Sequence, residues 1–132
     1  MNVLDDLIDF LAAAGLGLTH GTNLFTGPIK ARSTVVPVDA VFATGAGGPP
    51  PERAMGQIEE TRRAVISLQI RWSTQEAGDA KIRSIQNALQ GISVSGYLDI
   101  SSLESEPTLI GRDPEGYYIF LLNIQMIYNE VA

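Results

Sequence analysis

The chain lacks cysteine altogether and has a single histidine, His20. Without cysteine, disulfides, thiolate zinc sites, iron–sulfur clusters and cysteine nucleophiles are excluded. With one histidine, in a polar stretch beside Gly21, neither a histidine-rich metal site nor a Ser–His catalytic pair is expected. The sequence therefore predicts no catalytic residue, no metal site and no bound cofactor, and it favours a binding or assembly protein over an enzyme.

Charge is also scarce, since charged residues make up 18% of the 132 positions. Fifteen acidic residues against nine basic ones give a net charge of −6, which argues against electrostatic binding of the protein to DNA phosphates. No apolar run spans a bilayer, because the stretch from Phe10 to Leu18 is too short, so no membrane partner is expected. The length fits a single domain over residues 1–132.

Apolar periodicity indicates two helices and at least four strands. The helices are expected over residues 3–14 and 76–91, and the strands over residues 34–43, 60–72, 94–103 and 117–128. A further short strand is expected around Leu24–Phe25, and Pro37 marks the strand over 34–43 as an edge strand or a broken one. The pattern α-β-β-α-β-β predicts an α+β fold with a mostly antiparallel sheet of four strands or slightly more.

Two segments are rich in glycine, proline and turn residues. Residues 44–51 carry a glycine run, but three prolines follow instead of a Gly-Lys-Ser/Thr and a helix, so we expect a loop and no phosphate site. Residues 104–116 are expected to be turns, with a tight turn at Asp113-Pro114-Glu115-Gly116. This segment lacks the alternating carboxylates of a calcium loop.

The last expected strand is long. Its 12 residues, 117–128, would extend about 40 Å, roughly twice the usual strand length. One of its faces is wholly apolar and the other is half apolar. Two explanations stay open: a helix packs on each face, or part of the strand forms a subunit interface.

Three stretches together resemble the tail terminator family of long-tailed bacteriophages, whose members are also described as minor capsid or tail completion proteins. The first runs from Val41 to Pro50 and ends in a Gly-Gly-x-Pro-like turn. The second is the strand Glu60 to Trp72 with the following helix Ala80 to Gly91. The third runs from Pro107 to Tyr117 and leads into the last strand. The order and spacing of these stretches over about 95 residues, from Val35 to Tyr128, carry the resemblance.

The resemblance implies a structural virion protein at the head-proximal end of the tail, assembled in the host cytoplasm. It implies a homo-oligomeric ring of six copies that caps the tail tube, stops its polymerisation and joins the major tail tube protein to the head–tail connector or stopper protein. DNA would pass through the channel without specific binding. The alternatives are a head-completion or stopper protein, and a small ligand-binding α+β domain.

Under this interpretation the functional residues are interface residues. The glycine–proline loop is expected to contact a neighbouring ring, and the arginines are expected to pair with acids of the adjacent subunit. The candidate interface residues are Gly45, Gly47, Gly48, Pro49, Pro50, Arg62, Arg63, Arg71 and Tyr128.

Overall fold

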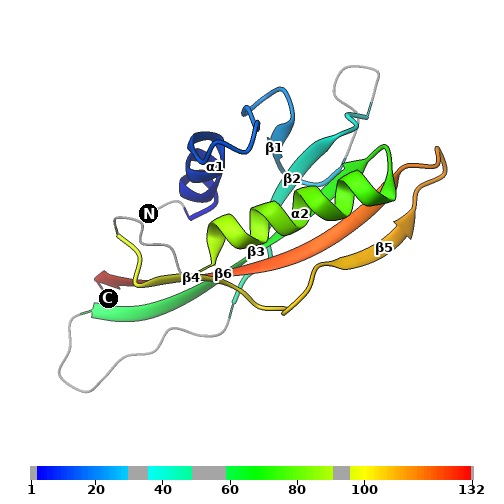
Figure 1. Ribbon diagram of the computed structural model, residues 1–132. Helices are drawn as coiled ribbons and strands as arrows, with labels where there is room; N and C mark the ends of the chain where they lie inside the picture. The colour runs from blue at the N-terminus through cyan, green and yellow to red at the C-terminus, as the bar shows by residue number, and fades with distance from the viewer. Residues whose placement is uncertain (1–2, 30–35, 49–58, 91–95, 132) are drawn as a thin grey trace.

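The computed structural model describes residues 3–29, 36–48, 59–90 and 96–131 (Figure 1). The described residues form two helices and six strands. In chain order these are α1 (Val3–Ala13), β1 (Leu24–Thr26), β2 (Ala40–Gly45), β3 (Glu59–Trp72), α2 (Gln75–Leu89), β4 (Asp99–Ser102), β5 (Thr108–Arg112) and β6 (Tyr118–Val131). This is an α+β fold, as the sequence predicts.

The six strands form one sheet in the order β1-β2-β3-β6-β4, and β5 also pairs with β6. All pairs are antiparallel except β1 with β2. The two 14-residue strands β3 and β6 pair over their whole length, from Glu59 opposite Val131 to Trp72 opposite Tyr118. The over-long last strand predicted from the sequence is therefore real, and it forms the centre of the sheet together with β3.

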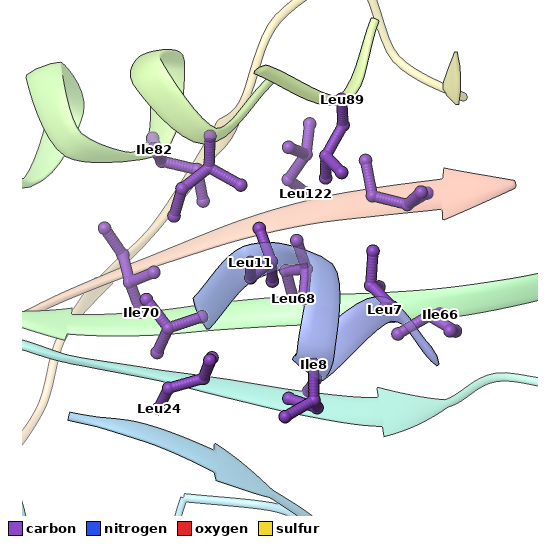
Figure 2. Close-up of a cluster of buried hydrophobic side chains, with 14 of the residues drawn as sticks. Leu7, Ile8, Leu11, Leu24, Ile66, Leu68, Ile70, Ile82, Leu89 and Leu122 are labelled. Carbon is purple, nitrogen blue, oxygen red and sulfur yellow. The ribbon is translucent and has the colours of Figure 1, made fainter. Parts of the chain in front are cut away.

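Both helices lie on the same face of the sheet (Figure 1). Alternation along the strands turns every second residue towards them, so Ile66, Leu68 and Ile70 of β3 are fully buried on the helix side. Figure 2 shows how Leu7, Ile8 and Leu11 of α1 and Ile82 and Leu89 of α2 meet these strand residues in one core. Of the two explanations left open for the last strand, the one with a helix on each face does not hold for the described residues.

The packing of α2 onto the sheet depends on its first turn. Thr74 is the N-cap, and its hydroxyl accepts a hydrogen bond from the Ala77 amide at 3.2 Å. Gly78 is the fourth residue of α2. A Cβ added to it would lie 2.7 Å from Phe120 and 2.9 Å from Trp72. The helix therefore approaches β3 and β6 at a distance that only glycine permits.

The structure corrects two predicted strands. Residues 36–39 belong to no strand, and β2 begins at Ala40 because Pro37 lacks an amide donor and Asp39 adopts a positive φ of 53°. The strand expected over 94–103 covers only Asp99–Ser102, and Tyr97 and Leu98 lie before it. Residues 34 and 35 and residues 94 and 95 lie outside the described part of the chain.

The third correction concerns the segment expected to be turns only. It contains β5, which pairs with β6 from Thr108 opposite Leu121 to Arg112 opposite Tyr118. The observed order of elements is therefore α-β-β-β-α-β-β-β, since β1 and β5 add to the expected pattern. The turn expected at Asp113–Gly116 is present, with the Gly116 amide donating to the Asp113 carbonyl at 2.9 Å.

Candidate functional site

Arg71 is the one charged residue among the described residues that is buried, with 2% of its surface exposed. It stands near the end of β3 between the core residue Ile70 and Trp72. Strand alternation turns Arg71 away from the helices, because its neighbour Ile70 faces them. A buried guanidinium requires partners, and the surrounding chain supplies them.

Two segments that are distant in sequence, residues 36–37 and 113–117, meet at the Arg71 guanidinium. Its Nε donates to Asp113 Oδ2 at 2.6 Å and one Nη donates to Glu115 Oε2 at 2.9 Å. The other Nη donates to the carbonyl oxygens of Val36 and Pro37 at 2.9 and 3.2 Å. The Tyr117 ring lies against the guanidinium, 4.4 Å from its central carbon. We call these six residues the Arg71 cluster.

The acidic turn is held in shape by its own backbone. Asp113 Oδ1 accepts hydrogen bonds from the amides of Glu115 and Tyr117 at 3.0 and 2.9 Å. Burial opposes ionisation of Asp113, but the hydrogen bonds from Arg71 and from these two amides outweigh it and lower the pKa of the carboxyl. Burial likewise opposes the charge of Arg71, yet hydrogen bonds with Asp113 and Glu115 raise its pKa. Both groups are charged at neutral pH.

The Arg71 cluster joins parts of one subunit. Because Arg71 already pairs with Asp113 and Glu115 of its own chain, a pairing with acids of an adjacent subunit is not needed to explain it. The turn is predictable from the sequence, but this pairing is not. Its partners lie 42 and 44 positions from Arg71, and no local pattern links them.

The other described candidate residues gather at the opposite end of β3. Arg62 lies opposite Tyr128 and Arg63 lies opposite Ile127 in the β3–β6 register, nine or eight residues from Arg71 along the strand. Tyr128 is 8% exposed, and its ring meets that of Tyr97 edge-on at 5.8 Å between centroids.

Two candidate glycines contact β3 near Arg63. The Val65 amide donates to the Gly47 carbonyl at 2.7 Å, and a Cβ on Gly48 would lie 2.0 Å from the Arg63 carbonyl oxygen. Gly45 ends β2, opposite Ile66. Pro49 and Pro50 lie outside the described residues. The structure therefore brings Gly47, Gly48 and the two arginines to one end of the sheet, and it places Arg71 at the other end.

Nothing in this geometry forms a reaction centre. The described residues hold no group of three or more His, Asp or Glu side chains that would bind a metal ion. They also hold no helix long and apolar enough to cross a membrane. The described side chains at these two ends of the sheet interact by packing, hydrogen bonding and ion pairing.

A family model described as bacteriophage tail terminator protein matches residues 10–130. The chain belongs to the bacteriophage tail terminator family. No curated protein matches the chain. The resemblance seen in the sequence is confirmed, and the match is longer than the stretches that carried it.

The match to the tail terminator family begins within α1 and runs into the last residues of β6. It includes the Arg71 cluster at one end of the sheet and the arginine pair at the other. As a tail terminator the protein is a structural component of the phage tail.

Proposed function

We propose that this tail terminator forms a closed ring of six copies that caps the finished tail tube, stops its polymerisation and joins the tail to the head connector. The observation that carries the proposal is the family match over residues 10–130 of a 132-residue chain. A structural component of the tail acts by assembly, and rings are the closed assemblies that head-to-tail contacts produce.

The sheet face turned away from the helices supports a subunit contact. Its central positions on β3 and β6 are uncharged and half-buried: Val65, Ser67, Gln69, Leu121, Asn123 and Gln125. Ser67 donates to the Asn123 side-chain oxygen at 2.6 Å, and the Asn123 amide donates to Glu104 at 2.7 Å. A mixed polar and apolar face with few charges resembles the centre of a protein–protein interface.

The proposed position is the head-proximal end of the tail, reached by assembly in the host cytoplasm. There the ring would contact the major tail tube protein on one side and the connector or stopper protein on the other. The net charge of −6 suits a channel through which DNA slides, because like charge keeps the phosphates from binding.

Within this ring, the end of the sheet that holds Gly47, Gly48, Arg62 and Arg63 is the first candidate for an intersubunit or inter-ring contact. Gly45, Pro49, Pro50 and Tyr128 belong to the same proposal. Arg71 contributes to it through the shape of its own subunit, because its hydrogen bonds are made within the chain.

The test is tube capping. Purified protein is added to polymerising major tail tube protein, and tube lengths and tube ends are measured by electron microscopy. Capping predicts shorter tubes with a ring at one end, and native mass spectrometry is expected to show a six-copy species. Tubes of unchanged length together with a monomeric protein would refute the proposal, and binding to DNA-filled heads instead of tubes would favour a stopper.

A further inference from the structure

Three large side chains form a row across the end of the sheet where β3 leads into α2 (Figure 1). Tyr118, the first residue of β6, lies opposite Trp72 of β3 on one side and opposite Arg112 of β5 on the other. Residues directly opposite each other have Cβ atoms about 4.5–5.5 Å apart, so neighbours in the row are within contact distance. Trp72 and Tyr118 are half-buried against the core, and Arg112 is exposed. We call these three residues the Trp72 row.

The guanidinium of Arg112 is held in place while its two Nη groups stay open. Its central carbon lies 5.0 Å from the centre of the Tyr118 ring, and its Nε donates to the Gly116 carbonyl at 3.2 Å. A Cβ at Gly116 would lie 3.2 Å from one Nη, so the glycine of this turn leaves room for the guanidinium. Because the side chain is already positioned in the free subunit, a partner that binds it causes little further loss of conformational entropy.

Arg112 differs from the paired arginines of the same chain. Arg71 contacts two carboxylates of its own subunit, and Arg83 likewise contacts two. Arg112 contacts no carboxylate within the described part of the chain. The Trp72 indole N–H and the Tyr118 hydroxyl also make no hydrogen bond to another described residue. The row therefore presents donors, and a carboxylate is the acceptor that an arginine binds most strongly.

The residue types of the row are those of an interface centre. Tryptophan, tyrosine and arginine are the side chains that most often carry the binding free energy of protein–protein contacts. Packing against the core explains the buried parts of Trp72 and Tyr118. It does not explain why their outer parts stand beside an exposed arginine that has no acid of its own. A contact with another protein surface explains all three side chains together.

The charge of the chain favours a second copy as the partner. With fifteen acidic residues and a net charge of −6, a neighbouring copy offers many carboxylates. Asp9 of α1, for example, is exposed and pairs with no described basic side chain. A DNA phosphate would also fit a guanidinium, but the same net charge repels DNA. Charge complementarity therefore selects a carboxylate of another copy.

We propose that the Trp72 row is an intersubunit contact in which Arg112 binds a carboxylate of the neighbouring copy and that copy covers the rings of Trp72 and Tyr118. The inference rests on the proposed ring and names one of the surfaces that build it. Gly47 and Arg63 lie towards the other end of β3, so the two ends of the sheet are different surfaces, as a head-to-tail contact requires.

The first experiment uses Trp72, which is the only tryptophan of the chain. Acrylamide quenching of its fluorescence is measured over a concentration range in which sedimentation velocity follows assembly. The quenching constant is expected to fall at least about twofold as the ring forms, because the centre of an interface excludes water. The emission is expected to shift to shorter wavelength. A ring in which Trp72 is quenched as readily as in the monomer would overturn the proposal.

The second experiment removes the cation. Arg112→Ala and Arg112→Glu are compared with Arg83→Ala, a matched control because Arg83 is 42% exposed and pairs within its own chain. Assembly is expected to be at least about tenfold weaker for Arg112→Ala, weaker still for Arg112→Glu and unchanged for Arg83→Ala. Thermal melts check that each variant is folded. Assembly of Arg112→Glu at the concentration of the unmodified protein would contradict the assigned contact.

These outcomes separate the inference from the proposed function. If the unmodified protein forms no ring and caps no tube, the proposed function fails and the inference falls with it. If it forms the ring while Trp72 stays open to acrylamide, the proposed function stands and the assigned surface is wrong. Protection of Trp72 that appears only when tail tube protein or duplex DNA is added would give the row to that partner, and it would overturn the contact between copies.

Discussion

The Nε of Arg71 lies 2.6 Å from Oδ2 of Asp113, and this hydrogen bond ties the end of β3 to the turn that leads into β6. Glu115 from the same turn and two carbonyls from Val36 and Pro37 complete the coordination. One side chain thus fixes the relative position of three segments. Its removal is expected to loosen a whole end of the sheet.

Replacement of Arg71 by methionine is expected to destabilise the subunit by about 3 kcal/mol, because it leaves the half-buried carbonyls of Val36 and Pro37 and the mostly buried Asp113 carboxylate without their donor. Arg71→Lys recovers part of the loss, since a lysine reaches one acceptor at a time. Urea denaturation of each variant measures its free energy of unfolding. Arg83→Met is the control, because Arg83 is 42% exposed and its ion pairs with Asp79 and Glu106 are solvated. An Arg71→Met protein as stable as Arg83→Met would contradict the assigned role.

The ion pair between Arg71 and Asp113 makes the stability of the protein depend on pH. The pKa of Asp113 is lowered in the folded chain, so its ion pair contributes fully above the pKa of about 3.9 of an unfolded aspartate. The contribution is lost as the pH falls below that value, towards the lower pKa of the folded state. Asp113→Asn is expected to be less stable than the unmodified protein at neutral pH and to approach it in stability as the pH falls from about 4 towards 2. Urea denaturation at several pH values measures this difference, and a constant gap down to the lowest pH would contradict it.

The central strands could be predicted from the sequence because their signal is local. Ile66, Leu68 and Ile70 alternate with polar residues, and this pattern alone places β3 within one residue of its observed start. The helices are predicted for the same reason. Their placement on one face is a property of the whole sheet, which periodicity within one element does not encode.

What the sequence does not show is non-local. The strand β5 has a proline before it, a glycine inside it and no alternation, and it is extended because β6 offers it an edge. The partners of Arg71 likewise come from segments more than 30 positions away. Turn chemistry correctly predicts the Asp113–Gly116 turn. The pairing of the Asp113 carboxylate with Arg71 depends on the position that the turn takes before β6, which no local pattern encodes.

Glycine is required at position 48 because the backbone there lies very close to β3. A Cβ at this position would lie 2.0 Å from the Arg63 carbonyl oxygen, and its φ of 150° is unfavourable for other residues. Gly48→Ala is therefore expected to cost about 1–3 kcal/mol of stability. Gly45→Ala is the matched control, since no atom lies within 4 Å of its Cβ position and its φ is ordinary. Thermal denaturation of both variants decides the point. Equal melting temperatures would show that the chain around Gly48 shifts without cost.

Tyr97 links α1 to the segment before β4, because its hydroxyl donates a short hydrogen bond to the Asp6 carboxylate. Burial, and after it the bond to Asp6, raises the pKa of Tyr97 above that of a free tyrosine. The neutral tyrosine therefore stabilises the fold fully below about pH 10, and this contribution is lost as the pH rises from there towards the folded pKa.

Tyr97→Phe keeps the ring and removes the donor. At neutral pH it is expected to destabilise the protein by about 1–2 kcal/mol, since a hydrogen bond to a charged group is lost. Above about pH 10 the gap to the unmodified protein narrows, because only the unmodified chain gains a tyrosinate on unfolding. Urea denaturation between pH 7 and 11 measures both values, with Asp9→Asn on the same helix as a control at an exposed acid. A gap that stays constant with pH would mean that Asp6 and Tyr97 do not interact as described, and that packing alone holds α1 against the sheet.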